Sequence, residues 1–328
     1  MRVSTLALGA VGGLVATIGL LRHRTMLKVA PELRDNELYY WYGPTCWATY
    51  WARKYLKGSV PLEITPGVLH EVINIPGSPD VKVYSYDPYG RPKDSRVVIW
   101  LHGGGRVLGS ATGSHTECSR LARAANALVL NVEYRLAPQH KYPAALDDAY
   151  QTLVWVLANS KELGIDPKKV AIAGASAGGG LSAELAQRAH DNGIDLACQL
   201  LVYPMLDDRT ISGNGKHYLG WTPAANKFSW SAYLGHPAGE PEDRPYAAAA
   251  RRKDLTGLPP AWIGIGDLDL FYDECLEYAQ RLRSAGVECE LRIEPRMYHG
   301  ADAIEPKPDQ MVGFFDSMVN ALKAATAD

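Results

Sequence analysis

Short apolar runs alternate with stretches of helical spacing along most of the chain. The apolar runs have the length and boundaries of β-strands, and they cover residues 69–75, 81–86, 96–101, 127–133, 170–174, 198–203, 261–266 and 289–294. The helical stretches between them cover residues 115–126, 144–159, 177–192, 272–285 and 308–325. This alternation predicts an α/β fold with a mainly parallel central sheet, an antiparallel start and helices on its faces.

Two segments interrupt the alternation. Residues 25–66 are rich in Trp and Tyr, and residues 206–255 form a long insertion between two predicted core strands. Long insertions at such points are usually functional. We therefore expect an N-terminal hydrophobic segment (1–24), a second segment (25–66) and one large domain (67–328) that carries the insertion at about 206–255.

The segment Gly174-Ala175-Ser176-Ala177-Gly178 follows an apolar run and precedes a helix-forming stretch. This context predicts a strand, a sharp turn and a helix, with Ser176 at the apex. Glycines are needed at both ends because strand and helix come too close together for larger side chains. A helix N-terminus also favours negative charge beside the hydroxyl. The pattern is that of a serine nucleophile.

A second glycine motif, His102-Gly103-Gly104-Gly105, ends the apolar run 96–101. Consecutive glycines leave backbone N–H groups uncovered, and such groups can donate to an oxyanion. In isolation a glycine run is usually a flexible turn. Two motifs in this order, each behind an apolar strand, favour a hydrolase instead. His102 itself is expected to keep the loop rigid, and not to act as the base.

The chain resembles the hormone-sensitive-lipase-like family of α/β-hydrolase esterases from about residue 68 to His299 and beyond. The segments that carry the resemblance are residues 102–110 (HGGGRVLGS), 133–138 (EYRLAP), 142–145 (YPAA), 166–167 (DP), 203–204 (YP), 258–260 (LPP) and 266–274 (GDLDLFYDE). Two positions depart from the family pattern. Ala175 stands where members usually carry Asp or Thr, and Arg106 stands where an aromatic residue commonly follows the glycines. Both departures bear on the substrate range.

A serine nucleophile needs a base and an acid that orients the base, and in α/β-hydrolases the chain order is serine, acid, histidine. His299 follows the final strand, and its neighbours match the family loop. The loop after residues 261–266 offers three acids. Asp267 is placed for a turn and Asp273 for the first turn of the next helix. Asp269 matches the acid of the family.

The resemblance implies a serine carboxylesterase that hydrolyses short- to medium-chain esters through an acyl-enzyme. The expected catalytic residues are Ser176, Asp269 and His299, and the expected oxyanion donors are the backbone N–H groups of Gly103, Gly104 and Ala177. An acyltransferase, lactonase, amidase or deacetylase on the same machinery remains an alternative. A non-catalytic hydrolase-fold binding protein is a third. The implied partner is a small-molecule ester, and no metal or organic cofactor is implied.

In the resembled family the two interrupting segments pack together as a cap over the active site and form much of the acyl pocket. Most of their aromatic residues should hold the cap together. The candidates for the pocket wall are Tyr42, Trp47, Arg106, Trp221 and Trp230.

Charge and cysteine content narrow the picture further. The net charge of −2 offers no basic field for nucleic acid or for an anionic membrane. Five cysteines without paired spacing predict mostly buried thiols and no disulfide framework. Arg135 is expected to form an internal ion pair with Asp147 or Asp148. Nothing in the sequence indicates the oligomeric state.

Residues 5–21 carry no charge, with Arg2 before them and Arg22, Arg24 and Lys28 after them. As a helix this run would cover about 26 Å, slightly less than a bilayer core of about 30 Å. We expect a membrane anchor, with the endoplasmic reticulum as one location. A cleaved presequence and a helix buried in the cap are alternatives. The cations after the run favour a cytosolic catalytic domain.

Overall fold

The centre of the structure is one eight-stranded sheet with strand order β1-β2-β4-β3-β5-β6-β7-β8. It is seen in a computed structural model that describes residues 20–35, 43–55, 63–213 and 216–327. Its strands are β1 (Val68–Ile75), β2 (Val81–Pro88), β3 (Ser95–Leu101), β4 (Leu128–Val132), β5 (Ile165–Ala175), β6 (Cys198–Val202), β7 (Ala261–Gly266) and β8 (Cys289–Glu294). The pairs β1/β2 and β2/β4 are antiparallel, and the remaining pairs are parallel. The predicted α/β fold with its antiparallel start is confirmed.

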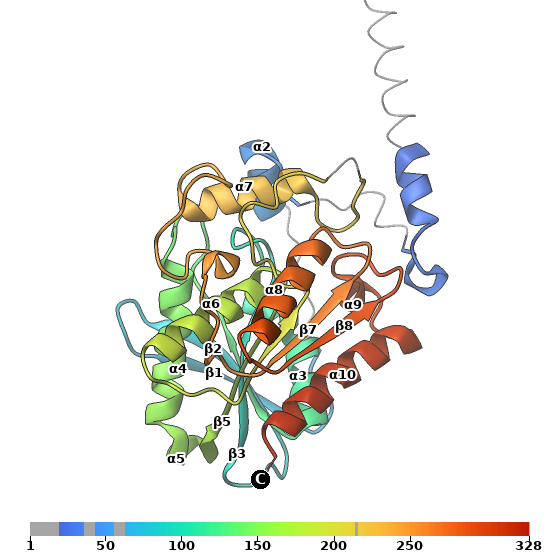
Figure 1. The fold of residues 1–328 in the computed structure, drawn as a ribbon. Helices are drawn as coiled ribbons and strands as arrows, with labels where there is room; N and C mark the ends of the chain where they lie inside the picture. Colours follow the sequence, from blue (N-terminus) through green and yellow to red (C-terminus); the bar gives the residue numbers. More distant parts are fainter. Residues whose placement is uncertain (1–19, 36–42, 56–62, 214–215, 328) are drawn as a thin grey trace, which may run out of the picture.

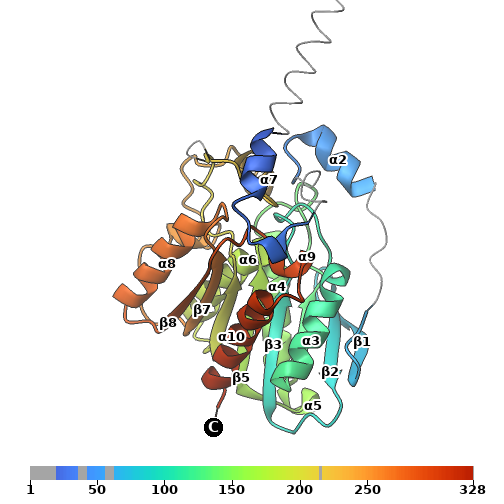
Figure 2. The same ribbon diagram turned by 90° about the vertical axis from the view of Figure 1, so that its right-hand side faces the viewer.

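Helices cover both faces of the sheet (Figures 1 and 2). One face carries α3 (His115–Ala125) and α10 (Asp309–Ala325), and the other carries α4 (Ala144–Ala158), α6 (Ala177–Asp191) and α8 (Tyr272–Ser284). All five coincide with predicted helical stretches. Other described elements are η1 (Pro31–Leu33), α2 (Trp47–Tyr55), η3 (Ala111–Ser114), α5 (Ser160–Leu163), α7 (Pro223–Leu234), η4 (Ala249–Arg251) and α9 (Ala301–Ile304).

Strand β5 begins earlier than its apolar run predicted. Ile165 pairs with Ser95 of β3, and the register then shifts before Val170 pairs with Val97. The polar and proline residues between these pairs lie at the exposed entry of the strand, so they hide it from a reading based on hydrophobicity. This entry end is remote from the carboxyl end of β5, where Ser176 follows.

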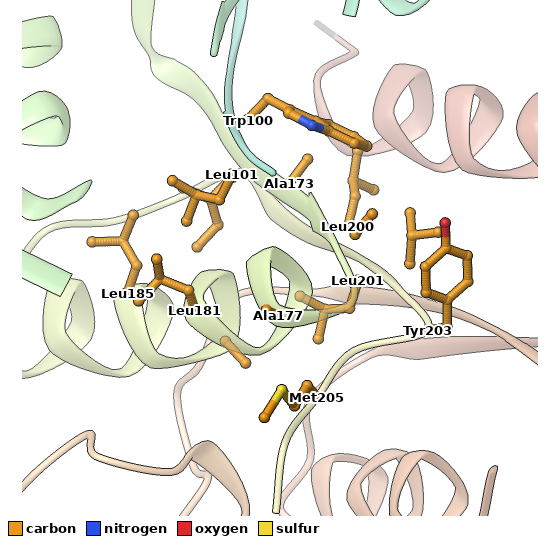
Figure 3. Packing of buried hydrophobic residues seen from close by; sticks show 14 of the residues in the cluster. Trp100, Leu101, Ala173, Ala177, Leu181, Leu185, Leu200, Leu201, Tyr203 and Met205 are labelled. Carbon is orange, nitrogen blue, oxygen red and sulfur yellow. The ribbon is translucent and has the colours of Figure 1, made fainter. Parts of the chain in front are cut away.

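Core side chains alternate between the two faces of the central strands, as strand geometry requires. Figure 3 shows Trp100 and Leu200 on one side of β3 and β6, and Leu101 and Leu201 on the side of α6. Leu181 of α6 extends towards the latter side. All five side chains are buried, so α6 is held on the sheet by apolar packing directly behind the turn that carries Ser176.

The two interrupting segments meet above the carboxyl ends of the parallel strands (Figure 1). The Phe228 ring on α7 contacts the rings of Trp47 and Tyr50 on α2, with centres 5.1 and 6.1 Å apart. Helix α7 begins where the Thr222 hydroxyl accepts the Ala225 N–H, and it ends at Gly235 with φ of 82°. These contacts agree with the expected cap.

Other sequence predictions have mixed outcomes. Residues 5–21, the expected anchor, lie almost wholly outside the described residues. Across the described ranges, no helix combines the length and apolarity that crossing a bilayer requires. The cysteines are free, and all but Cys46 are buried. Arg135 pairs with Asp148, whereas Asp147 pairs with Arg188.

The backbones of β3, β5 and α6 meet without intervening side chains at the turn around Ser176. A methyl group on Gly174 would lie 2.5 Å from the Gly178 carbonyl and 2.6 Å from the Leu101 oxygen. A methyl group on Gly178 would lie only 1.9 Å from that same Leu101 oxygen. Both glycines of the motif are therefore required by close packing, as predicted.

Gly178→Ala should destabilise the protein by about 1–3 kcal/mol or more, because α6 must move away from β3. Chemical denaturation measures this change. The control is Gly313→Ala on α10, where a methyl group meets no atom within 4 Å; it should stabilise the helix by about 0.5–1 kcal/mol. A Gly178→Ala protein as stable as the unsubstituted chain would contradict the packing argument.

Candidate active site

Ser176 occupies the apex of the turn between β5 and α6. Its backbone is in the left-handed region with φ of 57°, which is costly for a residue with a side chain. The turn is held because the Ser176 N–H donates to the Val202 carbonyl at 2.8 Å, and the Ser176 carbonyl accepts the N–H of Gly180 at 3.0 Å and of Met205 at 2.9 Å. The hydroxyl therefore has a fixed origin at the N-terminus of α6.

His299 approaches the serine from the loop after β8. Its Nε2 lies 2.8 Å from Ser176 Oγ. The imidazole is packed edge-on against Tyr203 and Phe271, with ring centres 4.8 and 5.1 Å away. A methyl group on Gly220 would lie 2.2 Å from the His299 carbonyl oxygen, so the insertion between β6 and β7 presses directly on the histidine backbone.

Asp269 orients this histidine. Its Oδ2 lies 2.7 Å from His299 Nδ1, and its Oδ1 accepts the Phe271 N–H at 2.9 Å. The two other acids of the loop do different work. Asp267 Oδ1 accepts the Arg296 N–H at 2.6 Å, and Asp273 is exposed in the first turn of α8. Of the three acids, only Asp269 is hydrogen-bonded to the imidazole.

The glycine loop, residues 102–109, lies against the serine turn. A methyl group on Gly103 would lie 3.2 Å from the Ala175 carbonyl oxygen and 3.5 Å from Ser176 Cβ. Within the described part of the chain, the backbone N–H groups of Gly103, Gly104 and Ala177 have no protein acceptor. These are the predicted oxyanion donors, and they are available beside Ser176.

His102 braces the glycine loop. Its Nδ1 lies 2.8 Å from the Gly103 carbonyl oxygen, and its ring is stacked on Tyr134 with centres 4.1 Å apart. The Tyr134 hydroxyl donates to the His102 carbonyl at 2.5 Å. These contacts agree with the structural role expected for His102.

A cavity of about 600 Å³ adjoins the glycine loop on the side of the cap. Its wall is mostly glycine and alanine, with Arg53, His102, Leu108 and Trp221 as its larger members. Trp221 is seated closely, because methyl groups on Gly43 and Gly105 would lie 2.6 and 2.4 Å from its ring. The cavity is therefore a largely apolar chamber beside the glycine loop, and Gly103 in its wall lies against Ser176.

The five predicted pocket residues have four different outcomes. Trp221 lines the cavity, whereas Tyr42 lies outside the described residues. Trp47 is 52% exposed and packs on Phe228. The prediction is wrong for Arg106 and Trp230, since both are fully buried away from the cavity. A long cation in a glycine loop suggested a pocket residue, but the guanidinium turns inward.

Sequence reasoning missed the partner of Arg106. Glu184 on α6 accepts two hydrogen bonds from the guanidinium, each 2.8 Å long. The only sequence signal was a carboxylate on the apolar face of a core helix, where a charge must be paired.

Two carboxyls near Tyr203, Asp302 and Glu117, were also missed. The Tyr203 hydroxyl donates to Asp302 Oδ1 at 2.8 Å, and the Tyr203 ring contacts the imidazole. Desolvation by the surrounding protein, reinforced by the charge of Asp302, raises the pKa of Glu117 to about 8. Desolvation likewise raises the pKa of Asp302.

Comparison with known proteins gives consistent matches. A family model described as α/β hydrolase fold matches residues 98–303. Carboxylesterase NlhH of Mycobacterium tuberculosis is 38% identical over 249 residues, which cover 73% of this chain and 77% of that protein. Gibberellin receptor GID1C of Arabidopsis thaliana is 35% identical over 208 residues, covering 60% of this chain and 59% of the receptor.

Solved structures agree with these matches. A bacterial heroin esterase superposes with a TM-score of 0.81 at 33% identity. The superposition covers 93% of this chain and all of the esterase.

Proposed function

The chain belongs to the α/β-hydrolase family, in its hormone-sensitive-lipase-like branch, and from this premise we propose that it is a serine carboxylesterase. The resemblance drawn from the sequence motifs is thereby confirmed. One observation carries the proposed activity. Ser176, His299 and Asp269 form a continuous hydrogen-bonded chain of 2.8 and 2.7 Å, and unpaired backbone donors lie beside the serine.

In the first half-reaction, His299 Nε2 takes the Ser176 proton as Oγ attacks the ester carbonyl. Asp269 accepts the Nδ1–H, which sets the tautomer and stabilises the imidazolium. The negative charge on the carbonyl oxygen is received by the N–H groups of Gly103, Gly104 and Ala177. Loss of a single such donor costs about 2.7–4 kcal/mol of barrier. His299 then returns the proton to the departing alcohol, and an acyl-enzyme remains.

In the second half-reaction, water attacks the acyl carbon. His299 takes a proton from the water, the same donors hold the second oxyanion, and the proton passes to Ser176 as the acid leaves. The neutral imidazole is restored at the end. An acyltransferase, lactonase, amidase or deacetylase would use the same groups with another acceptor or leaving group. The catalytic groups therefore do not identify the substrate, and the cavity must indicate which acyl groups fit.

We propose short- to medium-chain esters as substrates. The cavity of about 600 Å³ is apolar and has the size of a small-molecule site. Gly113 lines it, and a methyl group on that residue would meet no atom within 4 Å. The lack of a side chain at Gly113 is therefore what leaves room for a longer or bulkier substituent.

The relatives named gibberellin receptors favour a second candidate, a binding protein that uses the same chamber. Such a protein has no need of a hydroxyl, an imidazole and a carboxylate aligned within hydrogen-bond reach. That alignment favours the hydrolase, and a reagent that reacts only with an activated serine distinguishes the two.

We further propose that residues 25–66 and 206–255 act as the cap, and that residues 5–21 associate with a membrane. The contact of Phe228 with Trp47 supports the cap. The uncharged run supports the membrane association, as do Leu20 near its end and Leu27 after it, each 53% exposed.

Ser176→Ala should keep the fold and lower the hydrolysis of p-nitrophenyl butyrate by about 10³-fold or more. Asp269→Asn should lower it by about 10²–10⁴-fold, because the amide favours the wrong tautomer. Spectrophotometric assays of p-nitrophenol release measure both losses of activity, and circular dichroism checks the fold.

Asp273→Asn is the matched control, and its activity should stay within about two-fold of the original because exposed substitutions perturb little. A fluorophosphonate should label the unsubstituted chain and not Ser176→Ala. An unlabelled serine would remove the hydrolase and favour the binding protein.

Gly113→Trp should fill the cavity and separate substrates by size. We expect kcat/KM for p-nitrophenyl octanoate to fall by about 10-fold or more, while p-nitrophenyl acetate changes by less than about 3-fold. The same substitution at Gly313, on α10, is the control and should alter neither ratio. Equal losses for both esters would mean that this cavity does not receive the variable substituent.

The full-length chain should stay with membranes after carbonate extraction, because about 17 uncharged residues suffice for stable insertion. Deletion of residues 2–19 should release it into the supernatant. Quantitative release of the full-length chain would exclude the anchor, and a protease-protection assay reports the side of the membrane.

A further inference from the structure

We propose that Arg106 is a positioning residue, which clamps the glycine loop to helix α6 and cap helix α7 and thereby holds the oxyanion donors in place. This inference rests on the proposed esterase function. The nature of the contacts, the strained backbone of the loop and the location of the donors each support it.

The side chain of Arg106 is enclosed by two structural elements. Nη1 and Nη2 donate to Oε2 and Oε1 of Glu184, each at 2.8 Å, and neither side chain has any exposed surface. The guanidinium carbon also lies 4.4 Å from the ring centres of both Trp230 and Tyr233 on α7. A planar fork that pairs two oxygens and contacts aromatic faces is a geometry that Arg alone provides.

The neighbouring helix leaves space for this group. A methyl group on Gly180 would lie 2.9 Å from Arg106 Nη2 and 1.9 Å from the Met205 carbonyl oxygen. Because Gly180 has no side chain, α6 leaves space for both the Arg106 guanidinium and the Met205 carbonyl, which follows β6. Helix α6, which follows the proposed nucleophile, therefore also holds the Arg106 side chain.

The backbone of the glycine loop needs such a clamp. Gly104, Gly105 and Arg106 have φ of 121°, 64° and 63°, so three successive residues lie outside the regions that L-residues prefer. Glycine tolerates this, but arginine does not without compensation. The Gly104 carbonyl accepts the Leu108 N–H at 2.9 Å, which closes the turn. The contacts of the Arg106 side chain provide the compensation at the third position.

The clamp connects the same two segments that supply the oxyanion donors. Gly103 and Gly104 belong to the loop, while Ala177 is the first residue of α6. Arg106 is in that loop, and Glu184 is on that helix. A shift of about 1 Å between catalytic groups can lower a rate by about 10²-fold. Since Trp230 and Tyr233 contact the guanidinium, the position of the cap is coupled to the same geometry.

A purely structural ion pair is the competing explanation, and the two can be separated. Replacing a buried ion pair by apolar residues of similar volume is often neutral for stability, whereas removal of one partner leaves a buried charge. The double substitution Arg106→Met with Glu184→Leu therefore removes the fork without leaving a charge.

In the full-length double variant we expect a melting temperature close to that of the unsubstituted chain and a KM for p-nitrophenyl butyrate within about 3-fold. We expect kcat to fall by about 30-fold or more, as misplaced donors require. Hydrogen exchange of peptides covering residues 102–109 and α7 should become faster, with exchange in the central strands unchanged. Arg106→Lys, which keeps a cation opposite Glu184 but removes the planar fork, should give an intermediate loss of kcat, and it tests the proposal if the double variant does not fold.

The matched control is Arg251→Met with Asp208→Leu, which removes an ion pair of 2.6 Å with a fully buried carboxylate that involves neither the glycine loop nor α6. It should leave kcat within about two-fold, because the pair touches neither donor segment. A double variant at 106 and 184 with unchanged kcat and unchanged loop exchange would overturn the proposal. An unsubstituted chain without esterase activity would defeat the proposed function alone, since the exchange measurement still tests the clamp.

Discussion

The close approach of three backbone segments around Ser176 is the constraint on which the rest of the structure depends. Leu101 at the end of β3, Gly174 at the end of β5 and Gly178 in α6 meet with no room for a methyl group between them. This contact forces the left-handed backbone of Ser176 and directs the hydroxyl beyond the sheet. It also brings the glycine loop, which continues from β3, beside the serine. The proposed nucleophile and the proposed oxyanion donors are thus placed by the same packing.

The other reacting groups come from distant parts of the chain because parallel strands end at a common edge. Asp269 follows β7 and His299 follows β8. Asp269 is hydrogen-bonded to His299, and His299 is hydrogen-bonded to Ser176, which follows β5. The imidazole is enclosed by Tyr203 and Phe271, while the backbone of Gly220 touches the histidine from above. A rigid core and a tightly packed insertion together limit the freedom of the base, which is the condition for efficient positioning.

The insertion between β6 and β7 contacts both the cavity and the proposed base, His299. Trp221 forms one wall of the cavity, and the small residues around it set the available volume. Beneath the cap, the guanidinium of Arg106 connects the glycine loop with α6 and α7 through Glu184, Trp230 and Tyr233. A buried ion pair contributes little net stability compared with apolar packing. Its value here lies in the directional contacts that apolar side chains do not supply.

The strands, the helices and the glycine turn could be derived from the sequence, because they depend on periodicity and on local backbone demands, whereas the order of serine, acid and histidine was implied by the resemblance to α/β-hydrolases. Asp269 was separated from Asp267 and Asp273 by the turn and helix positions expected of those two and by the resemblance, and the structure brings it to the imidazole. The early start of β5 was hidden by polar residues at its entry. Sequence could not decide the direction of the Arg106 side chain, its pairing with Glu184 78 residues away, or the walls of the cavity. Those depend on long-range packing, which no local pattern records.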